Sequence, residues 1–276
     1  MSSTALPEKA RAKINLTLRV LGRRADGYHD LESLVAFADV ADTLTLQSAG
    51  QLAIALTGPF SSAIGSVQNN LVSKAYRELS ALIPGLKAGR FHLDKQIPVA
   101  AGIGGGSADA AAALRLLARA NDLALDDARL MTAALQVGAD VPVCLSSRAC
   151  VMTGVGERLS PPLALPKLPA LLVNPGVALA TRDVFAAFAK AGARDGPQLP
   201  GAAPLTLPAL IEFLKAHGND LTDAAISCVP VIGEVLAALR ALPGVQLARM
   251  SGSGATCFSL LASAEQASAG AARHGA

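Results

Sequence analysis

The sequence predicts an α+β protein built from two lobes. Segments in which apolar and polar residues alternate, as in half-buried strands, are interspersed with amphipathic segments of helical length. These segments follow no repeated strand–helix–strand period, which disfavours a doubly wound parallel sheet. A loose, proline-rich passage at residues 154–169 separates two such groups. We therefore predict an N-terminal lobe of residues 1–157 and a C-terminal lobe of residues 158–276.

The N-terminal lobe begins with predicted strands. Residues 12–20, AKINLTLRV, alternate strictly between apolar and polar side chains, which predicts one half-buried strand. Asp26-Gly27 marks a turn, and an apolar run follows it to Phe37. Residues 42–56 predict two further alternating strands, joined by a hairpin at residues 48–50.

Two helices in this lobe carry clear end signals. Asn70 precedes a helical pattern that stops at Pro84-Gly85, and residues 126–138 begin with two acids and end at Gly138. A short strand ended by Pro98 lies between them and leads into a glycine run. A third helix, rich in alanine, is predicted to start near Ser107.

In the C-terminal lobe, residues 169–176 predict a strand and residues 231–242 a helix with proline at either side. Residues 190–208 are rich in Gly, Pro and Ala and predict a long loop. Residues 245–261 predict two strands hinged on a Ser/Gly turn. No internal repeat is present in the sequence.

Composition favours a small-molecule partner. The 276 residues are 51% hydrophobic and 16% charged, which is typical of a compact protein, and the net charge is only +3. No dense Lys/Arg stripe with interleaved aromatics indicates nucleic-acid binding, and no apolar stretch is long enough for a membrane span. The four cysteines have neither CxxC spacing nor a disulfide framework. We expect free thiols in a cytoplasmic protein.

The stretch IPVAAGIGGGSADAAAALRLL, residues 97–117, has four glycines within five residues. A Walker A loop needs a lysine after its second glycine, and no lysine occurs here before Arg115. A dinucleotide fingerprint needs Gly or Ala at its sixth position, where Ser107 or Asp109 stands, depending on the starting glycine. The sequence excludes both of these phosphate loops.

Two interpretations of the glycine run remain open. Glycine backbone amides and the unpaired amides of the following helix together form an anion site, and Ser107 can cap that helix or offer its hydroxyl to a phosphate or metal. Asp109, as a carboxylate in the first turn, competes for the same positive end. The alternative is a tight turn that feeds a closely packed, alanine-rich helix.

Three stretches resemble the motifs of one superfamily. Residues 98–112, PVAAGIGGGSADAAA, resemble the phosphate-binding second motif of the GHMP kinases. Residues 10–34, ARAKINLTLRVLGRRADGYHDLESL, resemble the first motif, and residues 249–258, RMSGSGATCF, the third. The resemblance implies the two-lobed GHMP kinase fold, with a ribosomal protein S5 domain 2-like N-terminal lobe and a ferredoxin-like C-terminal lobe.

Within the superfamily, the DGYH element resembles the form found in kinases of 4-diphosphocytidyl-2-C-methyl-D-erythritol, which act in non-mevalonate isoprenoid biosynthesis. This resemblance implies ATP-dependent phosphorylation of the 2-hydroxyl of that substrate. The alternatives are a homoserine or mevalonate kinase, whose substrates have no base to stack on DGYH, and a nucleotide-binding regulator without activity. A dehydrogenase is disfavoured by the failed dinucleotide fingerprint.

The resemblance also implies roles for individual residues. Asp140 matches the catalytic aspartate and Lys13 its partner lysine. Without the resemblance, Asp140 reads as an ordinary helix cap and Lys13 as part of a solvated strand face. The residues implied to bind substrate are Asn15, Tyr28, His29, Thr181 and Phe185, with Tyr28 and Phe185 on the two sides of the cytosine and His29 at its edge. Without the resemblance, Tyr28 reads as an aromatic residue in a turn, Phe185 as a core residue on a helix face, and Thr181 as a helix cap.

The residues implied to bind ATP are Asn70, Lys95, Pro98, Ala101, Gly102, Ile103, Gly104, Gly105, Gly106, Ser107 and Ala108. Ala108 departs from the common GGGSSDAA form of the family, which has serine there. ATP chemistry implies Mg²⁺, but no carboxylate cluster in the sequence indicates its ligands, and Ser107 is a candidate. We expect a monomer or a weak homodimer.

Overall fold

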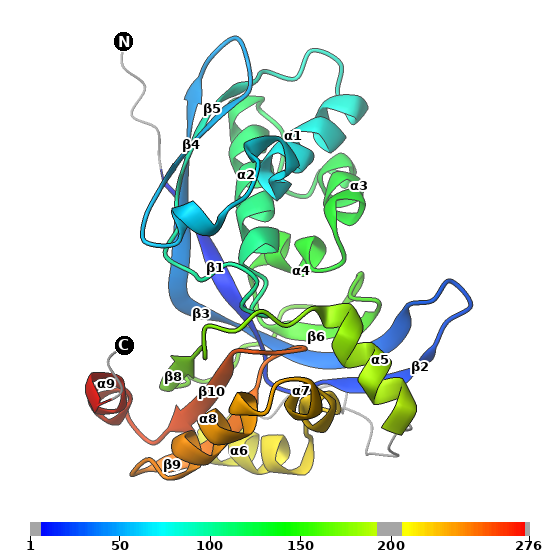
Figure 1. Ribbon diagram of the computed structural model, residues 1–276. Helices are drawn as coiled ribbons and strands as arrows, with labels where there is room; N and C mark the ends of the chain where they lie inside the picture. Colours follow the sequence, from blue (N-terminus) through cyan, green and yellow to red (C-terminus); the bar gives the residue numbers. More distant parts are fainter. Residues whose placement is uncertain (1–6, 192–205, 274–276) are drawn as a thin grey trace. The chain divides into compact units, whose positions relative to one another are not determined.

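The structure is a computed structural model that describes residues 7–191 and 206–273 (Figure 1). It divides into two compact units, each formed from separate chain segments. Unit 1 comprises Met1–Lys13, Phe37–Val99 and Gly104–Arg148; unit 2 comprises Ile14–Ala36, Ala100–Ile103 and Ala149–Ala276. The predicted lobe boundary after residue 157 lies inside the last segment of unit 2, and it stays a prediction.

Unit 1 contains a sheet in which β5 (Gly89–Asp94) is the middle strand. β5 pairs antiparallel with the second part of β3 (His29–Ser48) and parallel with β4 (Ala53–Thr57). The predicted hairpin between the strands of residues 42–56 is therefore wrong. Both strands form, but β5, which comes later in the chain, lies between them.

Four helices of unit 1 lie on one face of this sheet (Figure 1). They are α1 (Leu71–Leu82), α2 (Gly105–Ala120), α3 (Ala128–Val137) and α4 (Val141–Ser146), and two short 3-10 turns, Ser61–Ala63 and Val67–Asn69, precede α1. The end signals of α1 and α3 are confirmed: Asn70 Oδ1 accepts from the Val72 amide, and the Asp127 side chain caps α3 by accepting from the Arg129 amide.

Unit 2 contains β2 (Arg19–Arg23), the first part of β3, β6 (Cys150–Gly154) and β7 (Arg158–Leu159), and a three-stranded antiparallel sheet in the order β8 (Ala170–Val173), β10 (Cys257–Leu261), β9 (Val245–Met250). The predicted strand pair of residues 245–261 is confirmed. Its helices are α5 (Thr181–Ala191), α6 (Leu207–Ala216), α7 (Thr222–Cys228), α8 (Val231–Arg240) and α9 (Ala264–Arg273).

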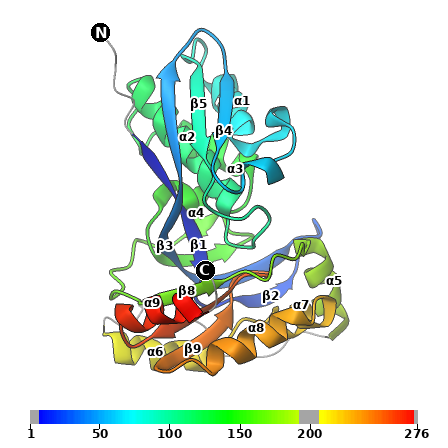
Figure 2. The ribbon, with the colours of Figure 1, turned by 60° about the vertical axis from the view of Figure 1, so that its left-hand side comes forward.

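The core of unit 2 joins α5, α7 and α8 to the three-stranded sheet. Apolar side chains of β2, α5, α7, α8 and the three-stranded sheet form one buried cluster. α9 packs beside β8, where Gly270 leaves room for Leu171 (Figure 2). The predicted helix at residues 231–242 is confirmed as α8. Of the predicted loop at 190–208, residues 192–205 lie outside the described residues, while the two ends are helical in α5 and α6.

The single strand predicted at residues 12–20 is wrong in two respects. β1 (Glu8–Asn15) ends before Leu16, and β2 begins only at Arg19. The chain leaves the strand geometry because Leu18 pairs with another segment: its amide donates to Gly218 O and its carbonyl accepts from the Asp220 amide. The polar residues of this stretch, such as Asn15 and Thr17, are also buried, so neither face is solvated.

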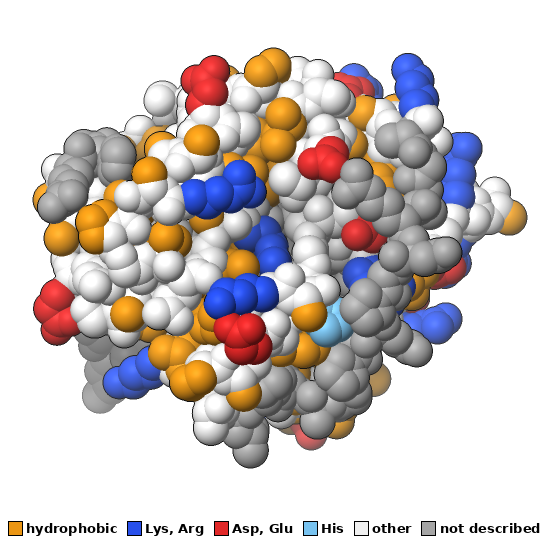
Figure 3. Space-filling model, turned by 90° about the horizontal axis from the view of Figure 1, so that it is seen from below, with side chains coloured by type: hydrophobic (Ala, Val, Ile, Leu, Met, Phe, Trp, Pro, Cys, Tyr) orange, Lys and Arg blue, Asp and Glu red, His pale blue; other side chains and the backbone are white. Residues whose placement is uncertain are grey.

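The face in Figure 3 carries charges of both signs. Lysine and arginine side chains on the face in Figure 3 are dispersed among acidic and apolar ones and form no continuous basic stripe. None of the described helices combines the length and apolar character that a membrane crossing requires.

Candidate active site

The glycine run forms a loop that opens onto the N-terminus of α2. Gly102 and Gly104 have φ of +74° and +66°, a region that favours glycine. The first helical bond runs from the Ala108 amide to Gly104 O, which leaves the amides of residues 105–107 at the open end. α2 thus begins at Gly105, two residues before the predicted start, because Gly104 itself takes the N-cap position. Ser107 lies in the first turn and does not cap the helix, so of the two roles that the sequence allows it, only that of a hydroxyl offered to a phosphate or metal is left.

The third motif supports the start of this loop within unit 2. The carbonyl of Ala101 accepts from both the amide and the hydroxyl of Thr256, at 3.2 and 2.5 Å. A Cβ placed on Gly102 would lie 1.8 Å from Gly254 O. Only a residue without a side chain fits there while Gly254 stays in place. This close packing is what the tight-turn interpretation requires, and it also shapes the loop that the anion-site interpretation requires, so both are supported.

Lys13 and Asp140 form an ion pair in unit 1. Lys13 Nζ donates to Asp140 Oδ1 at 2.7 Å; the lysine side chain is 5% exposed and the aspartate side chain 39%. Asp140 occupies the N-cap position of α4, yet its side chain makes no capping bond. Both structural alternatives are therefore wrong: Lys13 does not lie on a solvated face, and the Asp140 side chain does not cap a helix.

Gly104 lies against this pair. A Cβ placed on Gly104 would meet the Lys13 side chain at 3.4 Å and the Cys144 sulfur at 3.9 Å. Burial raises the pKa of the Cys144 thiol to about 12, so this cysteine is neutral at physiological pH and is no nucleophile. The structure thus brings three predicted site residues together in unit 1: Lys13, Asp140 and Gly104.

Lys95 lies in a buried cluster of charges that the sequence did not predict. Its ammonium donates to Asp42 Oδ2 at 2.5 Å and to Asp109 Oδ2 at 2.7 Å. Burial opposes the charged form of Lys95, but the two carboxylates outweigh it and raise its pKa. The ammonium also lies 3.4 Å from the position of a Cβ on Gly105. Asp109 faces this cluster rather than the open end of α2, so the predicted competition with an anion is wrong.

Asp42 fixes the chain that enters the loop. Its Oδ1 accepts from the amides of Gln96 and Ile97 at 2.6 and 2.8 Å. Asp109, on α2, has one oxygen that is buried with no hydrogen-bond partner among the described residues. The cluster therefore ties β3, the segment before Pro98 and α2 together, and it contains two aspartates for one lysine.

The Asp109 carboxyl predicts a pH effect on stability. Burial raises its pKa from 3.8 to about 7, so between these values the folded state binds a proton that the unfolded state has released. We expect the free energy of unfolding of the wild type to fall, relative to that of Asp109→Asn, as the pH rises from about 4 to 7. Denaturant titrations across this range measure it. Asp126→Asn, at an exposed position, serves as the control, and parallel curves for wild type and Asp109→Asn would contradict the shift.

The other residues implied to contact ATP differ in exposure. Asn70 uses its Oδ1 to cap α1, which leaves its amide nitrogen for a ligand. Pro98 is half-buried, whereas Ile103 and Ala108 are buried. Their contacts with ATP stay predictions.

His29 and Phe185 meet in unit 2. Their rings stack with centroids 4.6 Å apart and an interplanar angle of 21°. Phe185 also packs against the unit 2 core, so its core interpretation is correct in part. Burial, with a smaller effect of Arg23, lowers the pKa of His29 and favours the neutral imidazole. Tyr28 is 63% exposed.

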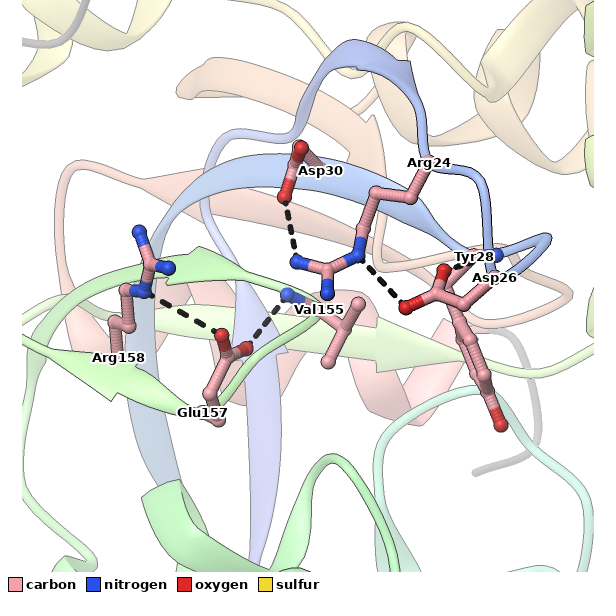
Figure 4. Close-up of polar contacts among 7 residues, drawn as sticks. All are labelled: Arg24, Asp26, Tyr28, Asp30, Val155, Glu157 and Arg158. Atoms are coloured by element: carbon pink, nitrogen blue, oxygen red, sulfur yellow. Dashed lines mark hydrogen bonds and ion pairs between the residues drawn. The ribbon is translucent and has the colours of Figure 1, made fainter.

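The turn that carries Tyr28 is fixed by ion pairs (Figure 4). Arg24 lies between Asp26 and Asp30, at 3.0 and 3.3 Å, and the other oxygen of Asp26 accepts from the Tyr28 amide at 3.1 Å. The Arg24 amide donates to Tyr28 O, which closes the turn. In Figure 4 the ring of Tyr28 points away from these charged groups. The predicted turn at Asp26-Gly27 is confirmed, and it presents an exposed aromatic ring.

Asn15 and Thr181 both contact serines. Asn15 donates from its backbone amide to Ser251 Oγ and from its side-chain amide to Ser33 Oγ, while its Oδ1 is buried without a partner among the described residues. Thr181 Oγ1 lies 3.0 Å from Ser253 Oγ. The sequence predicted the third motif but gave no role to any of its residues. Membership of that motif is the signal that could have pointed to Ser251 and Ser253.

No group of three or more His, Cys, Asp or Glu side chains that could hold a metal occurs within residues 7–191 and 206–273. The hydroxyl of Ser107, in the first turn of α2, is an oxygen donor of the kind that Mg²⁺ accepts beside phosphates and water.

Comparisons with known proteins agree with the motifs. Residues 70–148 match the GHMP kinases N terminal domain and residues 206–276 the GHMP kinases C terminal domain. A 4-diphosphocytidyl-2-C-methyl-D-erythritol kinase of Bradyrhizobium diazoefficiens is 58% identical over an alignment that covers 97% of this chain and 92% of that protein.

Solved structures give the same result. A crystal structure of 4-(cytidine 5'-diphospho)-2C-methyl-D-erythritol kinase matches with a TM-score of 0.78 and 35% identity, over 97% of this chain and 94% of that one. A homoserine kinase from Cytophaga hutchinsonii matches with a TM-score of 0.66 and 18% identity, over 96% of this chain and 88% of that one, and shows the shared fold. The predicted α+β fold and kinase activity are confirmed. The chain belongs to the GHMP family of small-molecule kinases, and within it to the 4-diphosphocytidyl-2-C-methyl-D-erythritol kinases.

Proposed function

We propose that this kinase transfers the γ-phosphate of ATP to the 2-hydroxyl of 4-diphosphocytidyl-2-C-methyl-D-erythritol. The observation that carries the chemistry is the 2.7 Å pair of a buried Lys13 ammonium and a partly exposed Asp140 carboxylate. Similarity to relatives of that name over nearly the whole chain supports the substrate. The homoserine kinase is similar at 18% identity, which supports the fold alone.

In the proposed reaction, Asp140 acts as the general base. Lys13 engages Oδ1, so the remaining oxygen is the one that takes the proton of the substrate hydroxyl. The hydroxyl oxygen bonds to the γ-phosphorus as the bond from that phosphorus to its bridging oxygen breaks, and ADP leaves. The Lys13 ammonium holds the carboxylate in place and offsets negative charge that develops on the transferred group.

The glycine loop is proposed to hold the phosphates of ATP. The open amides of residues 105–107 and the positive end of α2 favour an anion without any lysine inside the loop. Mg²⁺, when bound, neutralises phosphate charge, and we propose the hydroxyl of Ser107, in the first turn of α2, as its protein ligand. We propose that the remaining residues of the set also line the ATP site; they are Asn70, Lys95, Pro98, Ala101, Gly102, Ile103, Gly104 and Ala108.

The cytosine is proposed to bind at the aromatic residues of unit 2. Phe185 packs against the core and its ring stacks on that of His29, Tyr28 is exposed on a fixed turn, and the neutral His29 can hydrogen-bond the edge of a base. Asn15 has an unpartnered Oδ1 that can accept from a substrate hydroxyl, and Thr181 is exposed. These features support the substrate roles of all five residues.

We further propose a cytoplasmic enzyme that acts as a monomer or weak homodimer. All four cysteines are free and three of them are buried, which suits a reducing compartment.

Incubation of the protein with ATP, Mg²⁺ and each of three acceptors tests the substrate. We expect ADP release with 4-diphosphocytidyl-2-C-methyl-D-erythritol and none above background with mevalonate or homoserine. Phe185→Leu should raise KM for the cytidyl substrate about fivefold, because it removes about 1 kcal/mol of stacking, and leave KM for ATP unchanged.

Phe213→Leu provides the matched control, since Phe213 also stacks on a histidine, His217, with centroids 4.2 Å apart. It should leave both KM values unchanged. Phosphorylation of mevalonate or homoserine alone would overturn the proposed substrate. Equal effects of the two leucine variants would show that Phe185 does not belong to the cytosine-binding site.

A further inference from the structure

Arg115 carries a buried charge in the alanine-rich helix α2. It lies on α2, where every residue from Ala108 to Ala118 is buried, and the residue is only 8% exposed. Burial of a charge is costly unless it is paired and fully hydrogen-bonded. The folded protein must therefore supply this side chain with both a countercharge and hydrogen-bond acceptors.

The partners of Arg115 lie on two other elements. Nη1 donates to the carbonyls of Cys144 and Leu145 at 2.8 and 3.1 Å, and Nη2 donates to the carbonyl of Lys9 at 3.0 Å. Nε donates to Glu8 Oε1 at 2.7 Å, which supplies the countercharge. Each of the three nitrogens is used, and all these contacts lie within unit 1.

These two elements are the ones that carry the Lys13–Asp140 pair. Cys144 and Leu145 belong to the last turn of α4, and Asp140 stands at its N-cap. Carbonyls in a last turn lack helical donors, so a cation that binds them fixes the helix end and offsets its negative dipole. Lys9 lies on β1, four residues before Lys13. One guanidinium thus holds both elements against α2.

The same arrangement reaches the glycine loop. α2 begins at the loop, and the neighbours of Gly104 are the Lys13 side chain and the sulfur of Cys144, whose carbonyl Arg115 binds. A shift of α4 or β1 relative to α2 would therefore change both the ion pair and its distance from the loop.

We propose that Arg115 is a positioning residue for the Lys13–Asp140 pair. Its planar fork ties β1 and α4 to the helix that carries the phosphate loop, and so sets the geometry in which Asp140 meets the substrate hydroxyl. The inference rests on the proposed catalytic role of the pair. A misplacement of about 1 Å costs on the order of 100-fold in rate, so such an anchor acts on turnover more than on binding.

Arg119 offers a matched control on the same helix. It pairs with the other carboxylate oxygen of Glu8, but its side chain is 46% exposed, and no bond from it to α4 occurs among the described residues. A variant at Arg119 therefore perturbs Glu8 and the charge of α2 while it leaves the anchor on α4 in place.

The test compares Arg115→Ala, Arg115→Lys and Arg119→Ala in steady-state kinetics, with the folded fraction measured for each. We expect Arg115→Ala to lower kcat about 10- to 100-fold with KM for ATP within about threefold of wild type. The kcat of Arg115→Lys should lie between those of wild type and Arg115→Ala, because an ammonium keeps the charge but cannot bind three carbonyls as a planar fork does. Arg119→Ala should keep kcat within about twofold, as exposed pairs contribute little. Guanidinium ion at non-denaturing concentrations should partly restore kcat of Arg115→Ala, and sodium at equal ionic strength should not.

A folded Arg115→Ala with kcat within twofold of wild type would overturn the proposal, as would a loss of stability alone with kcat per folded molecule unchanged. If neither of these Arg115 variants folds, Arg115→Gln decides, because its neutral amide can still donate to a carbonyl but lacks the fork that reaches both α4 and β1. Lower kcat at unchanged KM for ATP supports the anchor, and unchanged kcat overturns it. Asp140→Asn is measured alongside. If that variant stays active, the catalytic role of the pair fails; if it is inactive while Arg115→Ala is normal, only the positioning role fails.

Discussion

Replacement of Asp140 by asparagine is expected to lower kcat by about two to four orders of magnitude, the usual range for loss of a general base. Asparagine keeps the size of the side chain and can still accept from Lys13 Nζ, so the 2.7 Å contact survives as a weaker, uncharged hydrogen bond. What it loses is the oxygen that takes a proton. Because the amides of the glycine loop are untouched, KM for ATP should change by less than about threefold.

The control for this variant is Asp127→Asn. Asp127 occupies the N-cap of α3 as Asp140 does of α4, but its side chain caps the helix and pairs with Arg129. Asparagine is an equally good capping residue, so we expect stability and kcat close to those of wild type. Steady-state assays of both variants with ATP in excess give the comparison. An Asp140→Asn enzyme within a few-fold of wild type would exclude Asp140 as the base.

Local signals explain which elements could be predicted. α1 and α3 were found because their caps, Asn70 and Asp127, are next to the residues they bind. The hairpin at residues 48–50 was wrong because the partner of both strands is β5, some forty residues further on. The strand at residues 12–20 was wrong because Leu18 bonds to residues 218 and 220, and no pattern within nine residues carries that information.

The site divides in the same way. Lys13 and Asp140 were identified by resemblance to motifs. Periodicity alone assigned Lys13 to solvent, because the alternating pattern of residues 12–20 predicts a strand with one buried face. In the structure both faces of this stretch are buried. The Lys95–Asp42 pair and the Arg115–Glu8 pair join residues 53 and 107 positions apart. Ion pairs at such separations leave no periodic trace in a sequence. Their members are visible only as charged residues in apolar segments, and Arg115 in an alanine-rich helix is the clearest case.

Gly102→Ala is expected to have the second large effect. The new Cβ would lie 1.8 Å from Gly254 O, and both contacting atoms belong to the backbone, so no side-chain rotation relieves the overlap. The φ of +74° adds about 1–2 kcal/mol of strain for alanine. One of the two segments must therefore move, and with it the Ala101 carbonyl that Thr256 holds.

Gly85→Ala separates the overlap from the strain. Gly85 has nearly the same φ, +77°, but a Cβ there meets no atom within 4 Å. We expect this control to lose about 1–2 kcal/mol of unfolding free energy, from backbone strain alone, and to keep wild-type kinetics. Gly102→Ala should lose clearly more than the control in denaturant titrations and should raise KM for ATP about tenfold or more, since the displaced residues lead directly into the proposed phosphate cradle. If the two variants were equally stable and KM for ATP were unchanged, the close approach of Gly102 to Gly254 would have no part in shaping that cradle.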